Sequence, residues 1–156
     1  MTDIDTRLRI LEDQMAIQQL AARFTDAVNE RDPAAFAGLW VDGDALWEIG
    51  EPLASRAQGR EQIVAMLERL MAIESHFMQL THSGVINLDG DRATARWDMR
   101  ERGRGDGTYY DNLAVYNDIL VRTLDGWRFQ SRAYSYRFLD QSAFGGEAFE
   151  PIRSKG

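Results

Sequence analysis

The sequence contains no cysteine among its 156 residues. Disulfides, thiolate nucleophiles and cysteine metal ligands are therefore excluded, and this fits a reducing compartment, so we expect a cytoplasmic protein. The two histidines lie six residues apart, and no Asp or Glu stands at a spacing typical of a zinc site. No metal ion is therefore expected. No apolar run approaches the roughly 20 residues that cross a bilayer, and no signal-peptide pattern opens the chain. We therefore expect no membrane association.

Positive charge is also scarce, because 18 Lys and Arg residues stand against 25 Asp and Glu, for a formal net charge of −7. Phosphate backbones are bound by concentrated Lys and Arg, so the composition argues against a nucleic-acid partner. The sequence also has no phosphate-binding glycine loop, dinucleotide fingerprint or serine nucleophile elbow. We expect no cofactor.

What is present suffices for a substantial core, since 44% of the residues are hydrophobic. A chain of this length favours one domain over residues 1–156, with its core at about residues 13–138. Glycine-rich stretches at residues 103–107 and 145–156 are expected to be a surface loop and a flexible tail.

Apolar residues with helical spacing predict a first helix at about residues 13–31. Asp32 and Pro33 are typical of an N-cap followed by the first helical position, so a second short helix should begin there. A short strand is expected at about residues 45–49, and a third helix should follow Gly59.

The second half of the chain has strand character in four segments that are rich in aromatic and branched residues, at 77–88, 93–102, 109–121 and 127–138. The first pair and the last pair are separated by Asp89-Gly90-Asp91 and Asp125-Gly126, which are typical hairpin turns. Helices followed by an antiparallel meander predict an α+β fold, in which helices pack on one face of a curved, mainly antiparallel sheet and enclose an apolar pocket.

Three stretches, taken in order, resemble the SnoaL-like and scytalone dehydratase-like group of the nuclear-transport-factor-two-like superfamily. They are residues 24–32 with Phe36 and Trp40, His82 with residues 89–97, and residues 116–122 with 125–129 and Arg132. This resemblance covers most of residues 13–138 and implies a cone-shaped α+β barrel around a hydrophobic pocket. It implies the fold more specifically than the chemistry, because the group includes dehydratases, a dehydrochlorinase, cyclases and proteins without known catalysis.

Catalytic members of this group pair a histidine from the first long strand with an aspartate near the end of the first helix. The resemblance places the histidine at His82, while His76, followed by Phe77, resembles the dehydratase pattern equally well. The aspartate position falls on Asn29, whose carbonyl oxygen can accept the same hydrogen bond but adds no charge. A hydrogen-bonded sheet histidine without reactivity is the alternative for His82.

Alternation along residues 93–101 places a row of side chains on one strand face, ending at Glu101. If that face lines the cavity, Glu101 is a second acid or base whose pKa is raised by an apolar wall. The alternative is an exposed strand-end glutamate between Arg100 and Arg102.

Side chains along residues 110–118 also alternate between the two strand faces. In the row that contains Tyr116, the phenol can donate a hydrogen bond to a substrate oxygen. Hydrophobicity alone favours the opposite row, with Leu113 and Val115, as the core face, so the sequence leaves the inward face open. Further pocket-wall candidates, which plain core packing explains equally, are Trp40, Trp47, Phe77, Trp97 and Met99.

These residues predict a cofactor-independent lyase or isomerase of the dehydratase type that acts on a small hydrophobic cyclic molecule. His82 would be the acid or base, Asn29 would orient it, and Glu101 would be a second proton-transfer group. The alternatives are a non-catalytic small-molecule binding protein and a structural subunit of a larger oxygenase-type assembly. An exposed apolar row on one sheet face predicts a homodimer or homotrimer in each case.

Overall fold

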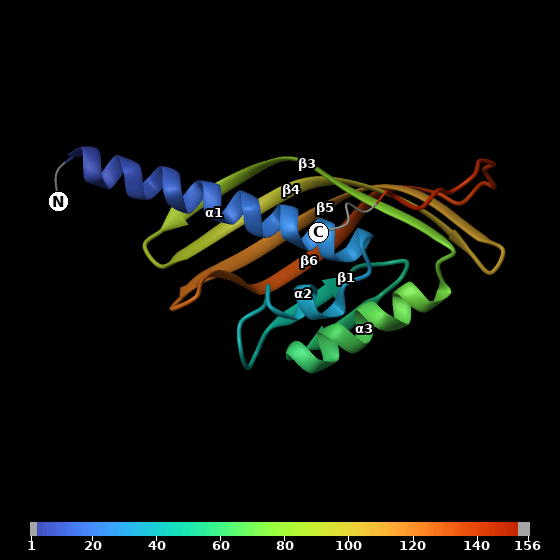
Figure 1. Cartoon of the computed structure of the whole chain (residues 1–156), viewed down its shortest axis with the longest axis horizontal. Coiled ribbons are helices and arrows are strands. Elements are labelled where there is room, and N and C mark those ends of the chain that lie inside the picture. The colour runs from blue at the N-terminus through green and yellow to red at the C-terminus, as the bar shows by residue number, and fades with distance from the viewer. Residues whose placement is uncertain (1–2, 153–156) are drawn as a thin grey trace.

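A computed structural model describes residues 3–152, and within them the chain forms three helices and six strands (Figure 1). The helices are α1 (Asp3–Asn29), α2 (Pro33–Ala37) and α3 (Arg60–Ile73). The strands are β1 (Leu46–Ile49), β2 (Ser55–Gln58), β3 (His76–Asp89), β4 (Arg92–Gly105), β5 (Thr108–Thr123) and β6 (Gly126–Asp140).

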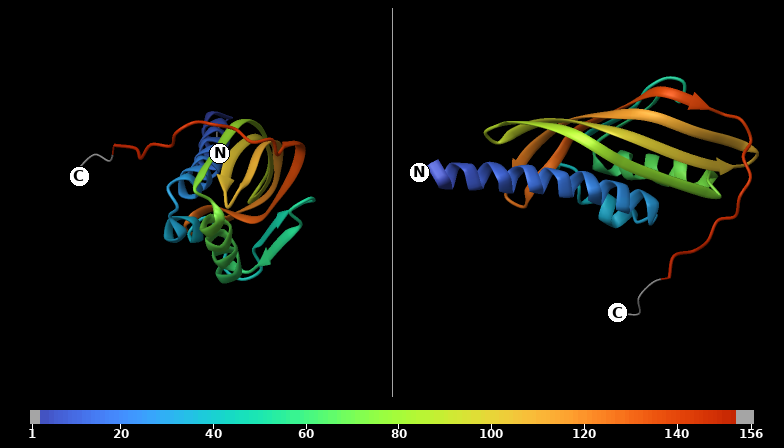
Figure 2. Two further views of the ribbon diagram at one scale, coloured as in Figure 1. Left: turned by 90° about the vertical axis from the view of Figure 1, so that its right-hand side faces the viewer. Right: turned by 90° about the horizontal axis from the view of Figure 1, so that it is seen from above.

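The strands form one curved sheet in the order β2-β1-β6-β5-β4-β3. Only the β1–β6 pair is parallel among these neighbours, so the sheet is mixed but mainly antiparallel. It is open, with β2 and β3 at its edges, and the helices lie on its concave side (Figure 2). The predicted α+β class and curved sheet are confirmed.

The helix α1 begins ten residues earlier than the apolar spacing predicts. Its C-terminal half buries the predicted stripe, including Ile17, Leu20 and Phe24, against the sheet. The N-terminal half has little apolar contact with the rest of the chain, so the core pattern could not reveal it. Asp3 and Asp5 lie in its first turn, where negative charge stabilises a helix.

Both later helices begin where the sequence predicts. The Asp32 carboxylate accepts a hydrogen bond of 2.9 Å from the Ala35 amide, and Pro33 occupies the first turn of α2. Gly59 is the N-cap of α3, and its φ of 83° lies in the left-handed region that favours glycine.

The long strands match the predicted segments, but two expectations need correction. Sequence reasoning missed β2, because its residues Ser-Arg-Ala-Gln lack a strand pattern and pair only with β1. The expected loop at residues 103–107 is strand as far as Gly105, because Gly103 and Gly105 pair with Tyr110 and Thr108 of β5.

Gly105 is required by the close approach of β4 to the end of α3. A Cβ atom there would lie 1.9 Å from the Ile73 carbonyl oxygen, so we expect Gly105→Ala to destabilise the fold by about 1–3 kcal/mol. Urea denaturation measures this change. Gly145→Ala is the control, because a Cβ at Gly145 meets nothing within 4 Å, and equal stability of the two variants would contradict the close approach.

The core contains a buried ion pair surrounded by aromatic rings. Arg132 donates to both carboxylate oxygens of Asp118 at 2.8 and 3.0 Å, and both side chains are 0% exposed. The guanidinium carbon lies 4.0–4.3 Å from the ring centroids of Phe24, Tyr116 and Phe129. Trp97 also donates to Asp118, at 2.9 Å. This unit joins α1 to β4, β5 and β6.

Within residues 3–152, no helix is both long and apolar enough to span a membrane.

Candidate functional site

A cavity of about 430 Å³ lies between α3, β1 and the concave face of β4, β5 and β6. Aliphatic side chains from α1, α3 and the β1–β2 connection form part of its wall, and seven aromatic rings form much of the rest. The polar lining residues include Glu74, Gln79, Glu101, Thr108, Asn112 and Gln141. The cavity therefore combines an apolar wall with two carboxylates.

Glu101 occupies the inner side of β4, as the alternation predicts, and its carboxylate reaches the cavity. It accepts one hydrogen bond from the side-chain Nε2 of Gln79 and another of 3.0 Å from the Tyr134 hydroxyl. Burial is the largest influence and raises the pKa of Glu101, while Gln79, Tyr134 and Asn112 act in the opposite direction. A carboxyl group with a raised pKa exchanges a proton more readily near neutral pH.

Glu74 is a second carboxylate in the cavity wall, at the C-cap of α3. Its Oε2 is buried and accepts no hydrogen bond of ordinary geometry from the described residues, although the Tyr110 hydroxyl interacts with this carboxylate. Burial raises the pKa of Glu74, whereas the Tyr110 hydroxyl and the charge of Arg31 lower it. The two carboxylates also interact, because the charge of Glu74 further raises the pKa of Glu101.

The phenols beside these acids are held in their neutral form. Burial, reinforced by the charge of Glu101, raises the pKa values of Tyr110, Tyr116 and Tyr134, and it raises that of Tyr136 to about 12. These hydroxyl groups are therefore hydrogen-bond donors at neutral pH.

The raised pKa of Glu101 predicts a pH-dependent loss of stability. An acid whose pKa is higher in the folded chain binds more protons folded than unfolded, so stability falls as pH rises from about 4.5 through the folded pKa. Glu101→Gln should therefore be more stable than wild type at pH 8 by about 1 kcal/mol, with no advantage at pH 4. Urea titrations at both pH values measure the difference. A variant less stable than wild type at pH 8 would contradict the raised pKa.

The structure does not bring either histidine into the cavity. His82 is exposed on β3, where the register with β4 shifts between Thr81 and Gly84. His76 is half-buried at the start of β3, opposite Arg104. Neither lines this cavity.

Asn29 does not orient a histidine but binds the backbone of β3. Its Nδ2 donates to the backbone carbonyl of Gln79 and its Oδ1 accepts from the backbone N–H of Gln79, each at 2.8 Å. Gln79, rather than His82, therefore occupies the strand position beside Asn29. Sequence reasoning missed Gln79 because the resemblance pointed to His82, and nothing local in the sequence marks Gln79 as a site residue.

This double contact predicts that aspartate is not tolerated at position 29. Asn29→Asp removes the Nδ2 donor and places a carboxylate oxygen against the Gln79 carbonyl, so we expect a loss of about 1–3 kcal/mol at pH 7. Thermal and urea denaturation measure it. Asp26→Asn, on the exposed side of the same helix, is the control and should change stability by less than about 0.5 kcal/mol. An unchanged Asn29→Asp would show that the contact contributes nothing.

Of the other predicted pocket residues, Trp47, Phe77 and Tyr116 line the cavity, so the Tyr116 row faces inward and the opposite row carries the exposed Leu113. The remaining three are buried but lie outside the cavity lining: Trp40 packs among core rings, Trp97 binds Asp118, and Met99 contacts Thr81. The cavity residues that sequence reasoning did not select include Glu74, Gln79, Tyr110, Tyr134 and Tyr136.

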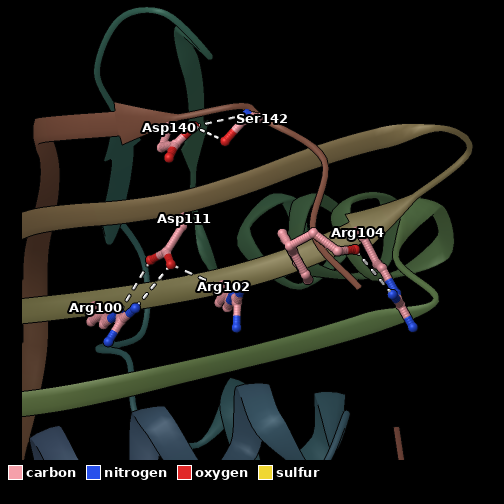
Figure 3. A network of polar contacts seen from close by, with 7 residues as sticks. Arg100, Arg102, Arg104, Asp111, Asp140 and Ser142 are labelled. Carbon is pink, nitrogen blue, oxygen red and sulfur yellow. Dashed lines mark hydrogen bonds and ion pairs between the residues drawn. The ribbon is translucent and has the colours of Figure 1, made fainter. Parts of the chain in front are cut away.

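The outer side of the same strands is charged and hydrogen-bonded. Arg100 donates to both oxygens of Asp111 at 3.1 and 2.9 Å, and Arg102 lies 3.5 Å from the same carboxylate (Figure 3). Arg104 donates to the Gly146 carbonyl, and Arg102 stacks on Phe144, so part of the expected flexible tail contacts the sheet. Residues 153–156 of that tail lie outside the described residues.

Among residues 3–152, no group of three or more His, Asp or Glu side chains is placed to hold a metal ion.

A small α+β domain with helices over a curved sheet and an aromatic cavity defines the class of this protein. The model of the SnoaL-like domain matches residues 9–133, and the chain belongs to this family. A search of curated protein sequences finds no significant match.

Solved structures share the fold at low sequence identity. An ntf2-like protein with a cystatin-like fold from Novosphingobium aromaticivorans is 27% identical (TM-score 0.76), with 88% of this chain and 90% of that chain covered. Hexachlorocyclohexane dehydrochlorinase LinA-type3 from Novosphingobium barchaimii is 21% identical (TM-score 0.80; 94% and 99% covered). A protein provisionally assigned as a scytalone dehydratase, also from N. aromaticivorans, is 18% identical (TM-score 0.77; 96% and 99% covered).

Proposed function

We propose that the chain is a cofactor-independent lyase or isomerase that acts on a small, largely apolar cyclic substrate, with Glu101 as the catalytic acid–base residue. The observation that carries this proposal is a buried carboxylate with a raised pKa, held by Gln79 and Tyr134 in an aromatic cavity. The fold shared with a dehydrochlorinase supports a reaction of this kind by analogy.

One proton-transfer group is sufficient for either reaction. The Glu101 carboxylate takes a proton from a carbon next to an electron-withdrawing group, and a cavity phenol donates to the atom that gains charge. In an isomerisation Glu101 returns the proton to another carbon. In an elimination the same proton goes to the departing hydroxyl, which leaves as water while a double bond forms.

Small-molecule binding without turnover is the second candidate. It is favoured by the contact of Asn29 with the Gln79 backbone, because amide side chains stand where catalytic members of the group pair a histidine with an aspartate. In this case the cavity binds the same class of ligand and Glu101 only accepts a hydrogen bond.

Incubation with a panel of alicyclic and aromatic hydroxy-ketones in deuterated water tests the proposal. We expect one class of compound to exchange a carbon-bound proton or lose water, as measured by NMR and mass spectrometry. Ligands that bind the cavity without any exchange or product would overturn the catalytic proposal in favour of the binding protein.

A further inference from the structure

The charged residues that line the cavity are of one sign. Its lining includes two acids, Glu74 and Glu101, and no Lys, Arg or His. The cation that acts on Glu74, Arg31, donates instead to the backbone carbonyls of Met71 and Glu74, at 3.1 and 2.7 Å. An anionic ligand would therefore meet two carboxylates without a countercharge, whereas a cation would gain from both.

The cavity wall is also rich in aromatic rings, whose faces attract cations. Tyr134 lies at the centre of this wall, with ring centroids 5.1 Å from both Tyr116 and Tyr136. The seven rings belong to Trp47, Phe77, Tyr109, Tyr110, Tyr116, Tyr134 and Tyr136. Aromatic walls combined with carboxylates are suited to an ammonium group.

We propose that the ligand of this cavity carries a positively charged nitrogen, held by Glu74 among the aromatic rings; this rests on the proposed function and adds the substrate class. Glu101 already accepts hydrogen bonds from Gln79 and Tyr134, whereas Glu74 interacts with the Tyr110 hydroxyl and its buried Oε2 accepts no hydrogen bond of ordinary geometry from the described residues. A buried unpaired carboxylate oxygen is costly; a cationic N–H would donate a hydrogen bond to it, and a quaternary nitrogen would offset its charge without a hydrogen bond. Glu74 then holds the cation and Glu101 transfers the proton.

Three phenols of matched shape test this assignment: 4-hydroxyphenyltrimethylammonium, 4-tert-butylphenol and 4-hydroxybenzenesulfonate. We expect calorimetry at pH 7.5 to give about tenfold tighter binding of the cation than of the neutral compound, and no binding of the anion. Glu74→Gln should remove the preference for the cation while leaving the affinity for 4-tert-butylphenol within about threefold. Glu68→Gln, on the exposed side of α3, should leave all affinities unchanged.

Equal or tighter binding of the neutral compound would overturn the cation assignment and leave the proposed function standing. Tight cation binding without turnover of any substrate would overturn the lyase and leave the cation assignment standing. If none of the three compounds binds, the cation assignment fails, and the hydroxy-ketone panel decides the proposed function.

The N-terminal half of α1 carries a separate unassigned surface. Four large apolar side chains form a stripe on the side opposite the one that packs on the sheet, at alternating spacings of four, three and four residues. They are Ile4 (63% exposed), Leu8 (53%), Leu11 (59%) and Met15 (65%). This part of α1 lies away from α2 and α3 (Figure 1). The spacing is that of a two-stranded coiled coil.

We infer that the same stripe of a second copy, aligned parallel, covers this face. Arg7 and Glu12 flank the stripe on opposite sides, five residues apart, and in a parallel pair each Arg7 faces Glu12 of the other copy. In an antiparallel pair Arg7 would instead lie on the side of the other copy's Arg7, so the charges select the parallel arrangement.

Charge reversal tests the pairing by sedimentation equilibrium. We expect Arg7→Glu to weaken association several-fold and Arg7→Glu combined with Glu12→Arg to restore it, while Leu8→Asp with Leu11→Asp abolishes this contact. Circular dichroism confirms that each variant is folded. Association that is unchanged or strengthened by Arg7→Glu would overturn the parallel pair.

Discussion

Replacement of Glu101 by glutamine should abolish most of the turnover while leaving the cavity intact. The amide keeps the size of the side chain and can still accept a hydrogen bond from Tyr134, but it cannot take up a proton. Positioned acid–base catalysis contributes about 10²–10⁴-fold, so kcat should fall by this factor, with a smaller change in KM. Steady-state kinetics with the substrate found in the panel measures it.

Two further variants separate a chemical role of Glu101 from a structural one. Glu101→Asp keeps the acid but shortens its reach, so we expect an intermediate rate with a shifted pH profile. Glu68→Gln, exposed on α3, should leave the rate unchanged. Wild-type turnover in Glu101→Gln would remove this residue from the reaction.

Loss of Arg132 should produce the largest loss of stability, because it leaves the Asp118 carboxylate buried without a countercharge. Breaking a buried pair from one side costs about 3–5 kcal/mol, so Arg132→Met should unfold at clearly lower urea concentration than wild type. The lost contacts with the rings of Phe24, Tyr116 and Phe129 act in the same direction.

A second substitution separates the stability cost of the unpaired Asp118 charge from the cost of the lost packing. In Arg132→Met the addition of Asp118→Asn removes the unpaired charge and keeps an acceptor for Trp97, so the double variant should be more stable than Arg132→Met alone. Arg137→Met, exposed on the same strand, should change stability by less than about 0.5 kcal/mol. A single variant as stable as wild type would show that the pair is not needed.

Local patterns predicted most of the fold because they act over a few residues. The Asp32-Pro33 start of α2, the Gly59 start of α3 and the Asp125-Gly126 turn depend on backbone preferences that each residue has by itself. Alternation along β4 likewise placed Glu101 on the inner face, because side chains alternate strictly along a strand.

The rest of the site depends on which segments meet in space. The packing of α1 on β3 put Gln79 rather than His82 beside Asn29, and the end of α3 brought Glu74 into the cavity with Tyr110 of β5 and with Glu101. Strand register and helix docking are set by packing over the whole sheet, which no local pattern records. The sequence by itself therefore determined the order and type of the elements except β2, and it placed Glu101 on one strand face without deciding whether that face is buried. Only the tertiary structure decided that this carboxylate has a second acid and several phenols around it in place of a histidine.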